Sequence, residues 1–270
     1  IEAEAEALAR LLTQEQGKPL PEAQAEIAYT CAFIRHLAVY DLQVKVIEDN
    51  VSRLVRQFRK PLGVVAAIIP WNFPVLIVAF KLPLALLAGN TMVVKPAPTT
   101  PLTTLKLGEI MAELLPAGVV NIITDQNDLG AALTTHPDVA KISFTGSTAT
   151  GQKIMASAAS TIKRLTLELG GNDAAIVLPG ADPAKVAPGL FAGAFMNAGQ
   201  VCLAIKRAYV HDSIYEEICT RLAQLAREAV VGDGLEQGVT IGPLQNRMQF
   251  DKVRGYLDAA RAEGRILAGG

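Results

Sequence analysis

The sequence has no surplus of positive charge and no apolar run of membrane-spanning length. Lys and Arg number 25 against 26 Asp and Glu, so no basic surface is expected that would neutralise nucleic-acid phosphates or an anionic bilayer. The most apolar stretch, Val75 to Gly89, is interrupted by Lys81 and Pro83 and is too short to span a membrane. We therefore expect neither nucleic acid nor a membrane as a partner.

Cysteine and histidine are scarce as well. Cys31, Cys202 and Cys219 are odd in number and far apart, which excludes a disulfide framework and a CxxC pair. The three histidines show no spacing typical of zinc ligands, so no metal site is expected. Free thiols are typical of a reducing cytoplasm. Neither an initiator Met nor a signal segment precedes Ile1, and we expect that something upstream is missing.

Apolar residues make up half of the 270 positions, enough to bury a core in one large or two smaller domains. Helical spacing of apolar residues predicts helices over residues 1–16 and 21–39. Alternation over residues 43–58 predicts a hairpin with Asp49-Asn50 at its turn. This hairpin is either an edge that pairs with another subunit or an ordinary surface hairpin, and the sequence favours neither.

The region after the hairpin alternates short β-branched runs with segments of helical period. Such alternation predicts an α/β fold in which a parallel sheet is connected by right-handed crossovers. A second α/β unit is expected to begin at Ala174, and the residues from Arg265 to Gly270 resemble the start of a strand. Strands are expected over residues 63–69, 91–94, 119–124, 141–144, 165–169 and 174–178, and helices over residues 189–198 and 213–230.

One glycine-bounded segment is a candidate phosphate site. Residues Gly146 to Gly151 follow a predicted strand and open a helix, so their backbone N–H groups can hold a phosphate. A Walker loop would need Lys directly after Gly151, but Gln152 stands there, and the GxGxxG fingerprint is absent. Taken alone, the segment is better explained as a turn that caps a helix.

Three side chains are candidates for covalent and acid–base chemistry. Cys202 lies just after Gly199, where the backbone can turn sharply and leave the thiol reachable, although a lone cysteine is more often buried packing. Glu168 ends an apolar strand, and apolar surroundings would raise its pKa towards that of a general base; otherwise it is a charge that faces water. Asn72 follows a predicted parallel strand, where its amide can donate to an oxyanion or simply shape a rigid turn.

Five motifs, in this order, closely resemble the aldehyde dehydrogenase superfamily over essentially the whole chain. They are Pro70-Trp71-Asn72-Phe73-Pro74, Gly89-Asn90-Thr91 to Lys95-Pro96, Phe144-Thr145-Gly146-Ser147-Thr148, Leu167-Glu168-Leu169-Gly170-Gly171 and Gly199-Gln200-Val201-Cys202. The resemblance implies a Rossmann-like NAD(P)-binding domain over residues 1–39 and 60–170, an oligomerisation hairpin over 40–59 and a partial catalytic domain over 171–270.

The resemblance also implies that an aldehyde is oxidised to a carboxylic acid with NAD or NADP. Cys202 would be the nucleophile, Asn72 with the Cys202 backbone N–H the oxyanion hole, Glu168 the base that activates water, and Lys81 a support for the thiolate. The implied cofactor residues are Ile69, Pro70, Trp71, Lys95, Pro98, Gly146, Ser147 and Gly170, with Lys95 at the adenosine ribose and Gly146 and Ser147 near the pyrophosphate. Phe73, Ile77 and Phe80 are expected to face an uncharged aliphatic or aromatic aldehyde.

Two departures from the family pattern bear on these expectations. NAD-preferring members often carry Glu three places after the ribose Lys, but Pro98 stands there, so NAD and NADP are not separated and Lys95 can serve a 2′-phosphate. Members also continue beyond Gly270, so we expect a fragment of a homodimeric or homotetrameric enzyme that alone is weakly active and prone to aggregate.

Other functions stay open at this point. A CoA-acylating relative would transfer the acyl group to a thiol, but such relatives tend to lack the carboxylate at Glu168, so water is favoured as the acceptor. An inactive truncated scaffold is the alternative outside the enzymes. A cofactor-independent cysteine hydrolase would need a His partner, and the spacing offers none.

Overall fold

The computed structural model describes residues 1–269, which divide into two compact units. The first comprises Ile1–Leu11 and Gln24–Leu169, and the second comprises Leu12–Ala23 and the residues from Gly170 onward. Each unit has its own strands and its own apolar core. Within residues 1–269, no helix is long and apolar enough to cross a membrane, and no cluster of three His, Cys, Asp or Glu side chains can hold a metal ion.

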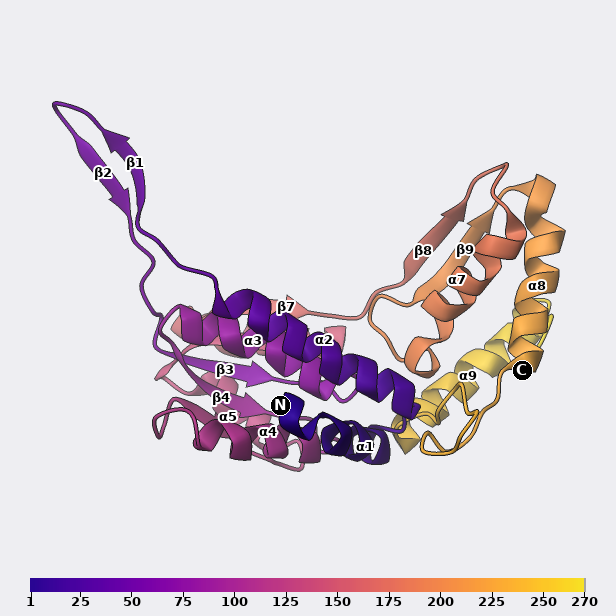
Figure 1. The fold of residues 1–270 in the computed structure, drawn as a ribbon, viewed down its shortest axis with the longest axis horizontal. Coiled ribbons are helices and arrows are strands. Elements are labelled where there is room, and N and C mark those ends of the chain that lie inside the picture. Colours follow the sequence, from indigo (N-terminus) through magenta and orange to yellow (C-terminus); the bar gives the residue numbers. More distant parts are fainter. Residues whose placement is uncertain (270) are drawn as a thin grey trace. The chain divides into compact units, whose positions relative to one another are not determined.

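A five-stranded parallel sheet in the order β5-β4-β3-β6-β7 forms the centre of the first unit (Figure 1). Its strands are β3 (Val64–Ile68), β4 (Thr91–Lys95), β5 (Val120–Ile122), β6 (Val139–Thr145) and β7 (Arg164–Glu168). Ala66 and Ala67 of the central strand are fully buried, because a parallel sheet is covered on both faces. The chain runs outward from β3 to β5 and then returns to the other side of β3, which is the doubly wound order.

Helices connect these strands. They are α3 (Pro74–Leu87), α4 (Leu102–Ala112), α5 (Leu129–Thr135) and α6 (Thr148–Ala158), the last followed by the 3₁₀ turn η2 (Ala159–Thr161). Helix α3 contacts α4, and α5 contacts α6. Right-handed crossovers place these two pairs on opposite faces, because the direction of winding reverses after β5. Ile142, Phe144 and Ile154 form the core beneath α6.

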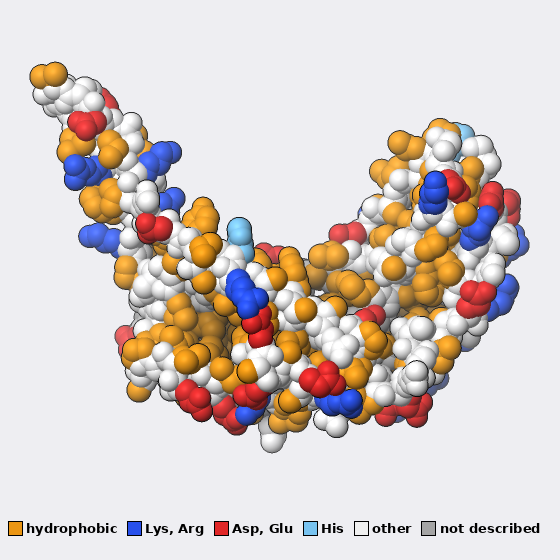
Figure 2. Space-filling view, in the orientation of Figure 1, with side chains coloured by type: hydrophobic (Ala, Val, Ile, Leu, Met, Phe, Trp, Pro, Cys, Tyr) orange, Lys and Arg blue, Asp and Glu red, His pale blue; other side chains and the backbone are white. Residues whose placement is uncertain are grey.

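The N-terminal helices and a long hairpin complete the first unit. The 3₁₀ turn η1 (Glu2–Glu4) leads into α1 (Ala5–Gln16), and α2 (Leu20–Ala38) follows. Strands β1 (Lys45–Asp49) and β2 (Leu54–Gln57) pair antiparallel and extend away from the sheet (Figure 1). Hydrophobic side chains are exposed along the hairpin (Figure 2), namely Val44, Val46, Ile47, Val51, Leu54 and Phe58.

The second unit contains the parallel pair β8 (Asp173–Val177) and β9 (Ile205–Val210), next to α7 and α8 (Figure 1). Its other elements are α7 (Pro183–Phe195), η3 (Met196–Gly199), η4 (Asp212–Ile214), α8 (Tyr215–Glu228) and α9 (Arg247–Glu263). Val177, Ala187, Leu190 and Ile218 form its core. The turn between α1 and α2 belongs here, since the Leu20 N–H donates to the Gly234 carbonyl at 2.9 Å.

The predicted α/β fold is confirmed, and most elements lie within a few residues of their expected bounds. Helix α7 begins at Pro183, well before the expected start at residue 189, because the Asp182 side chain accepts from the Ala184 N–H and Pro183 suits the first helical turn. Strand β9 and helix α9 were not predicted. The strand expected from Arg265 is wrong over residues 265–269, where no strand is found, and Gly270 lies outside the described residues.

Candidate active site

The carboxyl ends of the parallel strands bring most of the predicted cofactor residues to one edge of the first unit's sheet. Ile69, Pro70 and Trp71 directly follow β3, and the Ile69 N–H donates to the Lys95 carbonyl at 2.9 Å. Gly146 directly follows β6, the neighbour of β3 on the other side. The winding reverses between β3 and β6, and this switch point is where open α/β sheets bind ligands.

The turn after β6 leads directly into the N-terminus of α6. Ser147 is exposed and caps α6, since its Oγ accepts from the Thr150 N–H at 3.2 Å. The Gly146 N–H donates to the Glu168 carbonyl at 2.9 Å, and a Cβ on Gly146 would lie 2.5 Å from the Phe144 ring. A side chain does not fit at this position, so the backbone stays open to close approach. Together with the N-terminus of α6, these features suit a pyrophosphate.

Lys95 is the last residue of β4, and its ammonium group is already paired. Nζ lies 2.6 Å from Asp125 Oδ1, with the two side chains only 6% and 0% exposed. Burial of the Asp125 carboxyl acts to raise its pKa, but the hydrogen bond and charge of Lys95, with the backbone N–H groups of Leu129 and Asn127, outweigh it and leave the pKa below its usual value. Pro98 is half-buried.

Helix α2 holds the loop that carries Asn72 in place through Glu26. The buried carboxylate of Glu26 accepts from the Val75 and Leu76 N–H groups, both at 3.1 Å, and so caps the N-terminus of α3. Asn72 is half-buried, and its Oδ1 accepts from the Phe73 N–H at 3.1 Å. An amide whose oxygen is held in this way presents its NH₂ group as a donor.

Lys81 lies on α3 and is almost fully buried. Its Nζ donates to Ser143 Oγ at 3.0 Å. Burial lowers its pKa to about 8; the charge of Glu168 opposes this shift and that of Lys141 adds to it. A lysine with such a pKa is partly deprotonated near pH 8.

Glu168 is the last residue of β7, as predicted. Its side chain is exposed within this unit, which agrees with the second of the two settings that the sequence left open, a charge that faces water. The strand ends on the chain surface, and the following Leu169 turns inward towards Gly151 of α6, where a Cβ would lie 2.8 Å from Leu169 Cδ2.

Of the three predicted substrate residues, Phe73 directly precedes α3, and Ile77 and Phe80 lie in its first half. Phe73 and Ile77 are half-buried. Phe80 packs edge-on against two aromatic rings of α2, with ring centroids 6.2 Å from Tyr29 and 4.8 Å from Phe33. These contacts give Phe80 a packing role in the first unit.

Cys202 lies in the second unit, and it is the exposed member of the three cysteines; Cys31 is buried and Cys219 is intermediate. Its carbonyl accepts from the Gly171 N–H at 3.0 Å, and a Cβ on Gly171 would lie 2.8 Å from that carbonyl oxygen. Lys206 closes the loop from the other side, because its Nζ donates to the carbonyls of Val201 at 3.1 Å and Cys202 at 3.4 Å. The backbone that carries the thiol is therefore held on both sides.

Left-handed backbone precedes Cys202. Asn197, Ala198 and Gly199 have φ values of 51°, 55° and 73°. Only glycine adopts this region freely, so Asn197 and Ala198 store conformational strain that the surroundings must stabilise. The buried Asn197 contributes by donating its N–H to Glu22 Oε2 at 2.9 Å, within the second unit.

Three residues of these sites escaped sequence reasoning. Glu26 and Lys206 act on backbone groups that are distant in sequence or hidden in a loop, and no pattern marks them. Asp125 carried a signal, because it directly follows a run predicted as a strand, like the other candidates.

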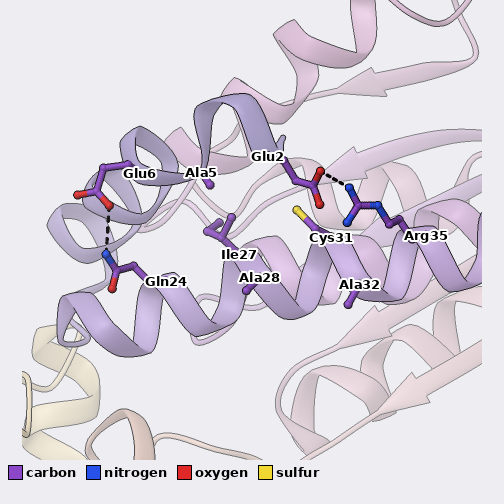
Figure 3. A pocket seen from close by; sticks show the side chains of 9 residues that line it. All are labelled: Glu2, Ala5, Glu6, Gln24, Ile27, Ala28, Cys31, Ala32 and Arg35. Atoms are coloured by element: carbon purple, nitrogen blue, oxygen red, sulfur yellow. Dashed lines mark hydrogen bonds and ion pairs between the residues drawn. The ribbon is translucent and has the colours of Figure 1, made fainter.

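A separate hollow lies between α1 and α2, and none of the predicted site residues lines it. It measures about 300 Å³, and it contains the ion pair between Glu2 and Arg35 and the contact between Gln24 and Glu6 at 3.1 Å (Figure 3). Cys31 opens onto it, and burial raises the pKa of that thiol, as does the charge of Glu2. The lining residues are Glu2, Ala5, Glu6, Gln24, Ile27, Ala28, Cys31, Ala32 and Arg35.

A doubly wound sheet with a turn into a helix at its switch point is the arrangement typical of dinucleotide-binding α/β proteins, and here a second unit carries an exposed cysteine. The model of the aldehyde dehydrogenase family matches residues 1–270. The chain therefore belongs to the aldehyde dehydrogenase family, as its motifs predict.

The proteins that resemble the chain include one named for NADP(+) and one solved with NAD+. It is 46% identical over 264 residues to a probable aldehyde dehydrogenase of Pseudomonas, with 98% of this chain and 54% of that protein covered. It is 42% identical over 269 residues to the NADP(+) succinate-semialdehyde dehydrogenase of Escherichia coli, with 97% and 56% covered. The NAD+ complex of an aldehyde dehydrogenase from Bacillus cereus superposes with a TM-score of 0.96 at 37% identity, over 99% and 56% of the two chains. The chain thus spans about half the length of these relatives.

Proposed function

We propose that the chain belongs to an enzyme that oxidises an uncharged aliphatic or aromatic aldehyde to a carboxylic acid with NAD or NADP. It provides the nucleophile and the cofactor edge, by which we mean the carboxyl ends of β3, β4, β5 and β6 with the residues that follow them. The observation that carries this proposal is the exposure of Cys202 on a loop braced by Gly171 and Lys206, in a member of the aldehyde dehydrogenase family. An exposed thiol next to a strained turn is suited to attack.

The chemistry begins with the Cys202 thiolate, which adds to the aldehyde carbon and forms a thiohemiacetal. In this proposal the Asn72 amide and the Cys202 backbone N–H donate to the resulting oxyanion. NAD or NADP, when bound, supplies a hydride acceptor, so that the adduct on Cys202 becomes a thioester. Glu168 then takes a proton from water, the hydroxyl oxygen attacks the thioester carbonyl, and the acid leaves as the sulfur of Cys202 regains a proton.

The remaining residues hold the reactants. Gly146 and Ser147 would face the pyrophosphate, Lys95 the adenosine ribose, and Ile69, Pro70, Trp71, Pro98 and Gly170 the rest of the dinucleotide. Lys81, whose pKa is about 8, would support the thiolate by its charge below that pH. Phe73, Ile77 and Phe80 would line the path of the aldehyde, with the Phe80 ring held in place by its packing on α2.

Assembly is part of the proposal. The exposed apolar side chains of the β1–β2 hairpin favour its use as a contact with a second copy, in a homodimer or homotetramer. A reducing compartment such as the cytoplasm would keep Cys202 a free thiol.

A base variant tests the proposal most directly. In Glu168→Gln the thioester should form but not hydrolyse, so mixing with aldehyde and cofactor should give a single burst of reduced cofactor without turnover. Mass spectrometry of the quenched sample should find the acyl group on Cys202. Glu113→Gln, an exposed residue after α4, is the matched control and should turn over like the unmodified protein. Continued turnover in Glu168→Gln would exclude Glu168 as the base.

A further inference from the structure

The buried ion pair between Lys95 and Asp125 is the feature that the proposed function leaves unexplained. Their charged atoms are 2.6 Å apart, and neither side chain is more than 6% exposed. A second contact, from Lys95 Nζ to the Pro96 carbonyl at 3.4 Å, occupies more of the ammonium group. The Asp125 carboxylate is held in turn by the Leu129 N–H at 3.1 Å. The pair is thus fixed on both sides.

Its position in the sheet links it to the cofactor edge. Lys95 is the last residue of β4, and Asp125 follows shortly after β5, the neighbouring parallel strand. Both side chains therefore lie at the carboxyl ends of strands, on the edge that includes the switch point between β3 and β6. In the proposed function this part of the edge receives the adenosine ribose.

The net charge of the pair affects how well a ribose with a 2′-phosphate binds, compared with a ribose with a 2′-hydroxyl. An unpaired Lys95 would attract the dianionic 2′-phosphate of NADP, because charge-assisted hydrogen bonds to phosphate are strong. The carboxylate of Asp125 cancels this positive charge and repels a phosphate, whereas a neutral 2′-hydroxyl can still accept a hydrogen bond from the remaining donor of the ammonium group. Pro98, which comes three positions later, adds neither charge nor an N–H donor.

We propose that Asp125 is a specificity-determining residue that acts through Lys95 and makes the cofactor edge select NAD over NADP. The inference rests on the proposed function, because it assumes that the adenosine ribose binds beside Lys95. It goes further by choosing between the two cofactors, which the motifs leave open.

Equilibrium binding measurements test the cofactor preference separately from the existence of the dinucleotide site. Isothermal titration calorimetry with NAD+ and NADP+ gives the ratio of their dissociation constants, and adenosine monophosphate with adenosine 2′,5′-bisphosphate gives the same ratio for the ribose end alone. We expect NAD+ to bind at least roughly tenfold tighter than NADP+, the effect of one charge-assisted interaction. In Asp125→Asn this ratio should fall by a similar factor, because the ammonium charge is no longer neutralised.

Asp128→Asn is the matched control: Asp128 lies in the same loop and is exposed, and its carboxylate accepts from the nearby Gln126 N–H at 3.2 Å. Its ratio should equal that of the unmodified protein. General damage to the fold would weaken both nucleotides together and leave the ratio unchanged, so a shift in the ratio reports specificity.

Two results would overturn the inference while leaving the proposed function intact: equal binding of NAD+ and NADP+ by the unmodified protein, or an unchanged ratio in a folded Asp125→Asn. The first needs no variant and decides the matter even if Asp125→Asn does not fold. If the unmodified protein binds neither nucleotide, the dinucleotide site itself is wrong, and the role of Asp125 is rejected with it.

Discussion

Replacing Gly171 with Ala tests how tightly the nucleophile loop is held. The Gly171 N–H donates to the Cys202 carbonyl at 3.0 Å, and an added Cβ would lie 2.8 Å from that oxygen and 2.5 Å from Asp173 Oδ1. The Asp173 side chain can rotate away. The carbonyl cannot, because it is part of the backbone that carries the thiol, so the loop must shift.

The size of the effect follows from these contacts. Overpacking of a well-packed site typically costs about 1–3 kcal/mol, and weakening the hydrogen bond adds about 1 kcal/mol, so we expect Gly171→Ala to lower the free energy of unfolding by roughly 2–4 kcal/mol. The neighbouring Gly170 is the control, since among residues 1–269, its chain neighbours aside, no atom lies within 4 Å of a Cβ at that position. Gly170→Ala should change the free energy of unfolding by less than about 1 kcal/mol.

Urea denaturation of the two variants measures the difference, and the rate at which a thiol reagent modifies Cys202 shows whether the loop has moved. We expect Gly171→Ala to unfold at a lower urea concentration than Gly170→Ala and to react at a changed rate. If the two variants unfold at the same urea concentration and react alike, the close contact between Gly171 and the Cys202 loop does not exist.

Charge, thiol reactivity and assembly give three further predictions. The pKa of Lys81 is lowered in the folded chain from 10.5 to about 8, so between these two pH values the unfolded chain binds more protons than the folded one. The free energy of unfolding should therefore rise over this pH range by about 1.4 kcal/mol per pH unit. Denaturation of Lys81→Met over the same pH range should lose this rise. A thiol reagent should modify Cys202 before Cys31, which is buried and has a raised pKa; equal rates in mass-spectrometric mapping would contradict the assigned exposures. Val46→Asp with Leu54→Asp should lower the mass found by sedimentation, and an unchanged oligomer would exclude the hairpin as its contact.

The sequence predicts the fold of the first unit well because its signals are local. The strands of the parallel sheet are buried on both faces, so they are short apolar runs, and the helices between them have apolar faces. Strand β9 was missed because Lys206 and Arg207 interrupt its apolar pattern, and the exposed α9 has no buried face that periodicity could detect. Strand β9 is defined by its pairing with β8, a tertiary contact and not a local preference.

In the candidate site too, residues in local motifs could be predicted and residues that act over long sequence distances could not. Cys202, Asn72 and Glu168 stand in motifs, so their identity could be predicted. Their support could not: the carboxylate of Glu26 is distant in sequence from the helix that it caps, and Lys206 acts on carbonyls. The surroundings of Glu168 stayed open between two alternatives, because an apolar strand does not show whether its last side chain points inward or outward.

The left-handed turn at Asn197, Ala198 and Gly199 limits how this protein can change. Glycine at position 198 would relieve the strain and make the folded chain more stable, yet it would also free the peptide units just ahead of the sulfur. A substitution at this position that raises stability would then be expected to lower activity. In the proposed function, alanine at that position would hold the peptide units ahead of the thiol in one conformation at some cost in stability.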